Sequence, residues 1–155
     1  HLCPQYGFAA TAFERLLRAS NDGVGDYEHS WSVASSRKIK FHNNQPPLYT
    51  GKSPYPCPWK PGDVIGLACA LDAMQMLVSI NGSFAAPNGV VFELAPDAVR
   101  DGLFAAFSGS TGKVRYNLGE VPFKYAPPSP DFVAFSEFPD VMPADEDVRI
   151  DVAST

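Results

Sequence analysis

The sequence predicts an all-β fold, an antiparallel β-sandwich of two sheets. Short runs of alternating apolar and polar residues recur along the chain, and the turn formers between them include 12 glycines and 15 prolines. Segments with helical spacing are nearly absent. With 155 residues, the chain is long enough to bury about two thirds of its unfolded surface as one domain.

The segment Ala10–Ala19 is the exception, because it has helical spacing. Phe13, Leu16 and Leu17 would share one face of a short helix. We expect a loop insertion that covers the edge of the sandwich, and a partner-binding helix is the alternative. The following Asn21–Asp26 combines acidic residues with glycines but lacks the distal Glu of a calcium loop, so turn chemistry explains it better.

The clearest pair of strands lies between Gly62 and Gly82. One face of the first strand would hold Ile65, Leu67, Cys69 and Leu71, and one face of the second Met76, Val78 and Ile80. This period of two predicts one buried face on each strand. Asp72-Ala73 closes the hairpin, and Asn81-Gly82, which accepts positive φ at both residues, opens the next turn.

Charge, hydropathy and cysteine usage exclude several classes of function. The formal net charge of −5 argues against a nucleic-acid surface, which needs clustered Lys and Arg. No apolar run reaches membrane-spanning length, so we expect no direct membrane contact. The three cysteines have no metal-ligand spacing, and we expect Cys69 in the core and Cys57 in a loop. That usage is typical of a reducing compartment and predicts a cytoplasmic protein.

Catalytic signals are weak throughout the sequence. There is no Gly-x-Ser-x-Gly elbow, His-Glu-x-x-His motif or P-loop, and the three histidines are scattered. Asp26 and Glu28 would share one face of a strand as a carboxylate dyad, but a solvated strand end accounts for them better. Ser108–Gly112 is Gly-rich without a helix after it, which favours a hairpin loop over a phosphate site. We therefore expect no catalytic activity, no metal and no cofactor.

An ordered set of short motifs runs through the chain. It comprises Tyr6-Gly7-Phe8-Ala9, Gly23–Tyr27 leading into Ser30–Val33, Trp59–Gly66, Leu103–Ser108 and Val114–Gly119. Taken in this order, the motifs resemble a SPRY domain of the B30.2/SPRY-like family, and are most similar to the SPRY domains of ryanodine receptors and large ubiquitin ligases. The resemblance implies a SPRY/concanavalin-like jelly roll whose last two strands are 103–108 and 114–119.

The resemblance also implies how the chain is divided. Residues 1–125 would form the SPRY-like sandwich, and the strands that the family places before Gly7 are missing, so we expect a sandwich that lacks its first strands. Residues 126–155 would form a Pro-rich and acidic C-terminal extension. Within it we expect Asp131–Phe135 to dock back on the domain and an acidic linker to begin at Glu137.

SPRY domains are binding modules. The resemblance therefore implies a non-catalytic protein–protein interaction or scaffold module within a larger intracellular protein, in the context of a calcium-release channel or a ubiquitin ligase. The expected partner is a protein or peptide, and packing against another domain of the same polypeptide is the alternative. A lectin-like carbohydrate-binding sandwich is the alternative from another class, with Asn43, Asn44 and Tyr49 as the nearest approach to a sugar platform.

The predicted partner site lies in two loops. By position, the resemblance places it at Phe41, His42 and Asn43 in the first loop and at Ser108, Gly109, Ser110 and Thr111 in the second. Five prolines between Phe41 and Trp59 restrict the first loop, which lowers the entropic cost of presenting Tyr49 and Tyr55 to a partner. The second loop offers only small polar residues where peptide-binding members often place a bulky aromatic. We therefore expect a flat protein contact there rather than a peptide pocket.

Overall fold

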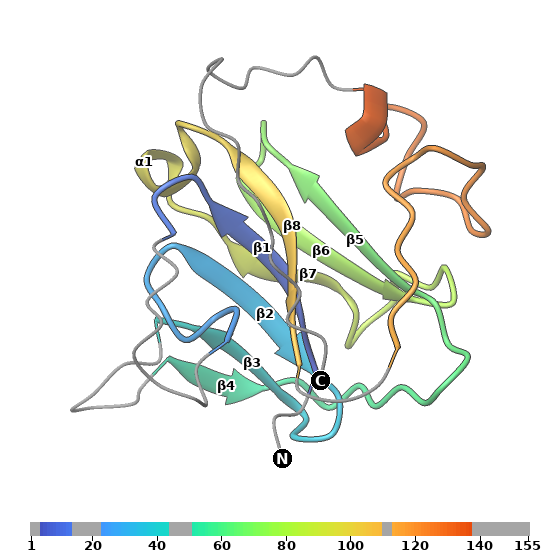
Figure 1. The fold of residues 1–155 in the computed structure, drawn as a ribbon, viewed down its shortest axis with the longest axis horizontal. Helices are drawn as coiled ribbons and strands as arrows, with labels where there is room; N and C mark the ends of the chain where they lie inside the picture. The colour runs from blue at the N-terminus through green and yellow to red at the C-terminus, as the bar shows by residue number, and fades with distance from the viewer. Residues whose placement is uncertain (1–3, 14–22, 44–50, 110–112, 138–155) are drawn as a thin grey trace, which may run out of the picture.

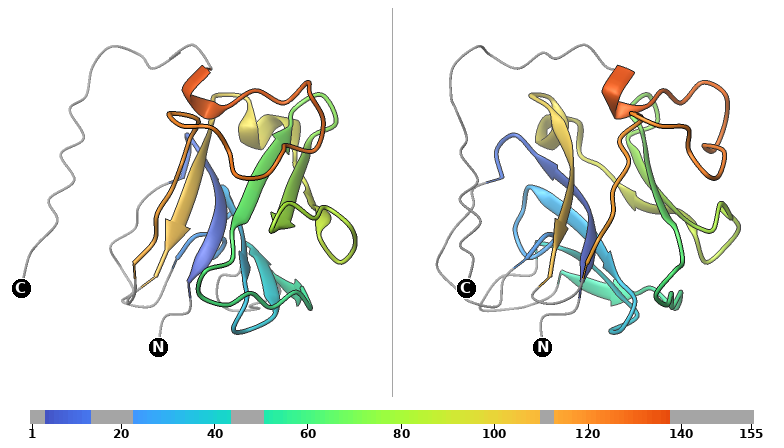
Figure 2. Two further views of the ribbon diagram at one scale, coloured as in Figure 1. Left: turned by 90° about the vertical axis from the view of Figure 1, so that its right-hand side faces the viewer. Right: turned by 45° about the vertical axis from the view of Figure 1, so that its right-hand side comes forward.

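The structure, a computed structural model, describes residues 4–13, 23–43, 51–109 and 113–137. They form two antiparallel sheets that pack face to face (Figures 1 and 2). The larger sheet has the order β4 (Lys52–Pro54), β3 (Ile39–His42), β2 (Ser30–Ala34), β1 (Gln5–Ala10), β8 (Leu103–Ser108). The smaller sheet has the order β5 (Ile65–Ala70), β6 (Gln75–Ile80), β7 (Gly89–Glu93). The predicted all-β, antiparallel two-sheet sandwich is confirmed.

Two short helical elements complete the described structure. The helix α1 (Pro96–Val99) precedes β8 and buries Val99, and the 3-10 turn η1 (Phe135–Glu137) lies in the C-terminal segment. No helix of these described ranges is long and apolar enough to span a membrane. The helix predicted over Ala10–Ala19 lies mostly outside the described residues and stays a prediction.

The β5–β6 hairpin forms as predicted, with Leu67 opposite Val78. Its turn is longer than expected, because Leu71–Met74 forms a four-residue turn and Met74 takes a φ of 52°. Leu71 therefore leaves the strand and is exposed, so its prediction as an inward-facing residue is wrong. The turn at Asn81-Gly82 has the positive φ at both residues that a tight hairpin turn requires.

Asp63 ties the entry of β5 to the end of β6. Its carboxylate accepts hydrogen bonds from the Lys60 amide at 2.9 Å and from Asn81 Nδ2 at 2.9 Å. The Asn81 Oδ1 in turn accepts from the Val64 amide at 2.9 Å. The hydrogen bond from Asn81 is the largest of the effects that lower the pKa of Asp63. These hydrogen bonds join residues just before β5 to the residue just after β6, and so help to fix the register of the two strands.

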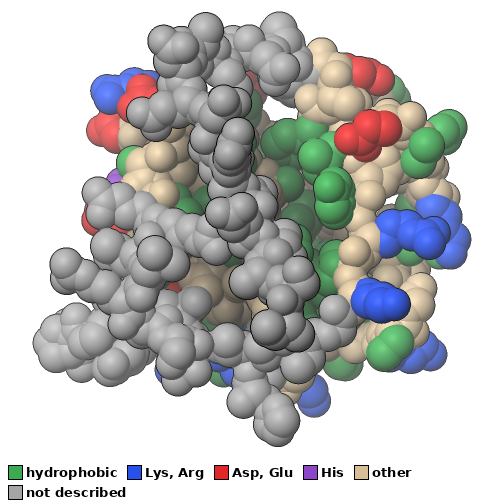
Figure 3. Space-filling view, in the orientation of Figure 1, with side chains coloured by type: hydrophobic (Ala, Val, Ile, Leu, Met, Phe, Trp, Pro, Cys, Tyr) green, Lys and Arg blue, Asp and Glu red, His purple; other side chains and the backbone are tan. Residues whose placement is uncertain are grey.

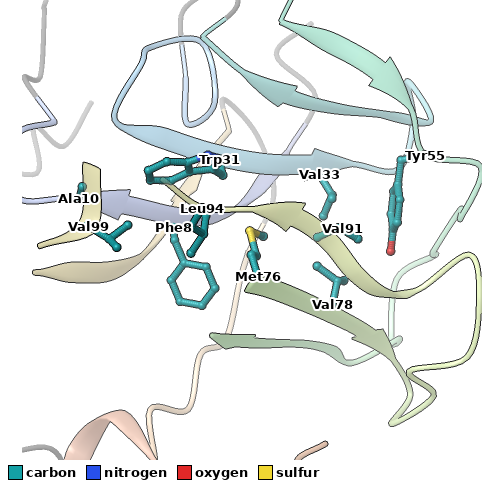
Figure 4. Packing of buried hydrophobic residues seen from close by; sticks show 10 residues of the cluster. All are labelled: Phe8, Ala10, Trp31, Val33, Tyr55, Met76, Val78, Val91, Leu94 and Val99. Atoms are coloured by element: carbon teal, nitrogen blue, oxygen red, sulfur yellow. The ribbon is translucent and has the colours of Figure 1, made fainter. Parts of the chain in front are cut away.

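The core lies between the sheets and draws side chains from both (Figure 4). Its buried members are Phe8, Ala10, Trp31, Val33, Tyr55, Met76, Val78, Val91, Leu94 and Val99. Cys69 packs against this cluster from β5, as predicted, and burial raises the pKa of its thiol to about 11. Trp31, Phe8 and Met76 are almost completely buried, which makes them the main apolar contacts between the two sheets.

The last predicted strand does not form. Val114–Gly119 has an alternating pattern, but none of it is paired as a strand, and residues 113–116 are exposed. The end of the segment is held in a turn instead, because Asn117 Oδ1 accepts a hydrogen bond from the Gly119 amide at 2.9 Å and its Nδ2 donates to the Val121 carbonyl at 2.9 Å. The prediction of a strand at 114–119, and of a regular hairpin with 103–108, is therefore wrong.

The C-terminal segment returns to the sandwich, as expected for Asp131–Phe135. The Phe135 ring stacks on the buried Phe8 ring at 5.9 Å between centroids. The Ser136 amide donates to the Leu118 carbonyl at 3.0 Å. Figure 2 shows this segment passing over the side of the sandwich where β8 and β5 lie.

A test of the sheet packing is Gly7→Ala. A Cβ at Gly7 would run into the Trp31 carbonyl of β2, because β1 is held closely between two neighbours. We expect a loss of about 3 kcal/mol of unfolding free energy in urea, in the upper part of the range for overpacking. The matched Gly62→Ala has positive φ but open space around it, and should cost about 1 kcal/mol. Equal losses for the two variants would contradict the packing of β1.

A second test uses the titration of Cys69. The folded protein holds the thiol proton more tightly than the unfolded chain, so this contribution to stability is complete below the ordinary thiol pKa and is lost as the pH rises through about 11. After discounting for the partial exposure of the thiol, we expect urea unfolding of the wild type to lose about 1 kcal/mol more than Cys69→Ala over this pH range. Parallel pH curves for the two proteins would contradict a buried thiol.

Candidate functional site

The first predicted loop does not present Phe41. This side chain is 1% exposed on the outer face of the larger sheet, opposite Ser32. Gly25 packs directly against it, and the Arg37 guanidinium lies 4.5 Å from its ring centroid. The loop that contains Gly25 thus covers the sheet, and Phe41 is a structural residue rather than a surface contact.

His42 and Asn43 remain accessible to different degrees. The His42 ring stacks on Trp31 at 5.0 Å between centroids, and its Nδ1 lies 3.0 Å from the Ser30 carbonyl oxygen. It is half-buried at the rim of the core. Asn43 is exposed and takes a φ of 51° at the end of β3. Among the three residues of the first loop, only Asn43 is exposed.

Tyr55 is also buried, in contrast to the prediction that it faces a partner. It is 2% exposed, and its hydroxyl donates to Asn88 Oδ1 at 2.8 Å. Burial is the main cause of the rise in its pKa. Tyr55 therefore fills the end of the core beside β7. The prediction that a loop presents Tyr55 on the surface is wrong. Tyr49 lies outside the described residues.

Ser108 has a structural role in the second loop. Its hydroxyl donates to Gln5 Oε1 at 3.1 Å and accepts from the Val24 amide at 3.0 Å. Gly109 is exposed, and Ser110 and Thr111 lie outside the described residues. Ser108 thus joins β8 to β1 and to the loop that contains Val24 and Gly25.

The sheet register separates the two predicted loops. β8 and β2 both run antiparallel to β1, and β3 runs antiparallel to β2. β3 and β8 therefore point in opposite directions, and the loops after Asn43 and after Ser108 leave from opposite ends of the sheet. The expectation of one site made from both loops is wrong, and partner binding at either loop alone stays a prediction.

The acidic residues near the N-terminus form a turn. Asp26 is buried, and its carboxylate accepts a hydrogen bond from the Gly23 amide at 2.8 Å. Glu28 is exposed, and neither residue lies in a strand, so the two carboxylates do not share a strand face. In the part of the chain that the structure describes, no group of His, Cys, Asp or Glu is arranged to hold a metal ion.

The structure reveals an apolar surface that the sequence reasoning missed. Of the large hydrophobic residues that the described ranges leave exposed, most follow Leu103. They are Phe104, Phe107, Val114, Tyr116, Val121, Phe123, Val133 and Phe135. Figure 3 shows hydrophobic side chains gathered where β8 and β5 face the viewer of Figure 1. The sequence signal that could have revealed this surface is the high density of large hydrophobic residues after Leu103, which begins with the two phenylalanines of β8.

The inward face of β8 explains part of this exposure. Phe107 pairs with Tyr6, and Ala105 pairs with the buried Phe8, so both point toward the space between the sheets. Phe107 is nevertheless 56% exposed. The smaller sheet ends at β5 and does not extend over this position.

The segment after β8 adds charge to this surface. The surface there is lined by Lys113, Val114, Arg115 and Tyr116, four consecutive residues that are all exposed. It combines two cations with apolar surface, and Tyr116 is 73% exposed. We call the side of the sandwich where the edges of β5 and β8 lie, together with residues 113–118 that follow β8, the open side (Figure 2).

A comparison with models of protein families finds none that matches this chain.

The burial of Phe41 can be tested by Phe41→Ala. Removing a buried aromatic ring should cost about 3–5 kcal/mol of unfolding free energy. Asn43→Ala, two residues away on the exposed end of the strand, should cost about 1 kcal/mol because alanine tolerates its positive φ less well. Chemical denaturation measures both, and an unchanged stability of Phe41→Ala would show that its ring lies on the surface.

Proposed function

We propose that this chain is a non-catalytic protein-interaction module that binds a protein partner through its open side. The observation that carries the proposal is the exposure of three large hydrophobic residues on or just after β8, namely Phe107, Val114 and Tyr116. Contiguous apolar surface on a folded domain marks interaction sites, and exposed aromatics such as Tyr116 are the residue type that dominates binding energy. The motif resemblance to SPRY domains supports the same class of function.

The proposal includes the cellular context. A SPRY-type module in a larger cytoplasmic protein would recruit a partner or pack against another domain of its own polypeptide. The sparse cysteines, of which Cys57 and Cys69 are free thiols, suit a reducing compartment. A lectin-like role remains the alternative, but the described part of the chain offers only Asn43 of its predicted sugar platform.

A capture experiment with matched variants tests the proposal. The full chain is used to capture proteins from cytosolic lysate, with mass spectrometry as the readout. We expect Tyr116→Ser to weaken the partner by at least about tenfold, as for a hot-spot aromatic, and Val114→Ser to weaken it less. Both side chains are exposed, so each substitution should change stability by less than about 0.5 kcal/mol.

The control is Val90→Ser on β7. Val90 and Val114 are exposed to similar extents, 48% and 42%, and the substitution is identical. A partner that is retained by Val90→Ser and lost by the two open-side variants supports the proposal. Equal recovery with all variants would place the partner elsewhere, and a melting shift with a sugar panel in place of protein capture would favour the lectin.

A further inference from the structure

The segment that follows β8 is held to the sandwich without hydrogen bonds. No strand forms between residues 113 and 137, and none of these residues is buried. Every hydrogen bond that these described residues make joins two residues of the same segment. Exposed backbone and few buried contacts are typical of a region that opens at low free-energy cost. The segment can therefore leave the sandwich without breaking a hydrogen bond to it.

Internal contacts close most of this segment into a loop. The Ser136 amide donates a hydrogen bond to the Leu118 carbonyl at 3.0 Å. Gly119 has a φ of 123°, and a Cβ there would run into the side chains of Ala134 and Ser136. We call residues 117–137 the C-terminal cover. Because its two ends are joined to each other, the cover can move as one unit.

Two aromatic side chains attach the C-terminal cover to the sandwich. The Phe135 ring stacks on the Phe8 ring at 5.9 Å between centroids, with 24° between the ring planes. The Tyr125 side chain packs against Gly82 in the turn after β6. Figure 4 shows the Phe8 ring pointing from β1 toward the side where the cover runs. Phe8 is 0% exposed, whereas Phe135 is 38% exposed, so a half-exposed ring covers a fully buried one.

The place that Phe135 fills adjoins the open side. The residue opposite Phe8 on β8 is Ala105, whose methyl group is too small to cover an aromatic ring. Phe107 follows two residues later on the same face of β8 and is exposed. Without Phe135, the rings of Phe8 and Phe107 would both be available to a partner. Aromatic side chains bury large apolar areas and stack with one another, so such a surface suits an aromatic ligand group.

We propose that Phe8 forms the floor of a binding site for an aromatic side chain, which Phe135 of the chain's own C-terminal cover fills until a partner displaces it. This inference rests on the proposed function and adds how binding at the open side is regulated. An occupant from the same chain lowers the apparent affinity of a competing ligand, because only the fraction of molecules with a free site can bind. The cover is thus an autoinhibitory contact.

The test uses the full chain and a labelled peptide with the sequence of residues 117–137, with fluorescence anisotropy as the readout. Phe135→Ala should bind this peptide at least about tenfold more tightly than the wild type, because its own site is vacant. Phe123→Ala is the matched control, since Phe123 lies in the same cover and is 47% exposed. It should bind the peptide as the wild type does. Equal affinities of the two variants, or no binding to Phe135→Ala, would overturn the site.

A second peptide and a dye test the role of the ring. The peptide with alanine in place of Phe135 should bind the Phe135→Ala chain at least about tenfold more weakly than the first peptide. A dye that fluoresces on apolar surfaces should report more exposed surface in Phe135→Ala than in Phe123→Ala, because Phe8 is uncovered. Equal fluorescence would show that Phe8 stays covered without Phe135, and would overturn the proposal. If Phe135→Ala does not unfold cooperatively in urea, Phe135→Leu takes its place, with Phe123→Leu as its control.

Three further outcomes separate this inference from the proposed function. If Phe135→Ala gains the peptide but no variant captures a lysate partner, the aromatic site is supported and the proposed function is overturned. If a lysate partner depends on Tyr116 but is recovered equally with the wild type and with Phe135→Ala, displacement is overturned and the interaction module stands. If the wild type sediments as a dimer that Phe135→Ala dissociates, the cover lies on a second copy and the autoinhibitory contact is overturned.

Discussion

The smaller sheet of the sandwich has three strands and cannot cover all five strands of the larger sheet. The position of β7 decides which strands of the larger sheet stay uncovered. β7 lies over β3, since Lys40 donates to the Val91 carbonyl and His42 and Lys40 both contact the Phe92 ring. The smaller sheet therefore ends at β5, before it covers the inner face of β8. Phe135 covers Phe8 from the C-terminal segment, but Phe107 stays exposed. The open side follows from this offset.

The elements that the sequence predicts correctly depend on contacts between near neighbours. The β5–β6 hairpin follows from alternation and from Asn81-Gly82, and Asp63 fixes its entry through bonds to Lys60 and Asn81. The strand predicted at 114–119 does not form, although its expected partner at 103–108 is close in sequence. Asn117 instead holds the end of the segment in a turn, which the alternating pattern does not reveal. Leu71 shows the same limit on a smaller scale, because the turn takes the four residues Leu71–Met74 instead of the predicted two, which moves Leu71 off the strand.

The candidate site was harder to predict than the fold. Phe41 and Tyr55 are aromatic residues near prolines and polar residues, a pattern typical of a presenting loop, but tertiary packing buries both. The Gly25 loop covers Phe41, and Asn88 accepts the Tyr55 hydroxyl. The reverse holds for Phe107, which lies in the continuous apolar run Leu103–Phe107 and is nevertheless 56% exposed. Its exposure depends on where the opposite sheet ends, which no local pattern encodes.

Hydrogen exchange of the backbone amides, followed by mass spectrometry, tests the open side most directly. β6 lies between two strands, so its amides should be protected up to the global stability. Outward-pointing amides of β5 and the amides of residues 113–116 should exchange much faster, because the structure gives them no strand partner. Protection of β5 equal to that of β6 would show that its edge is already covered, and would contradict an open side.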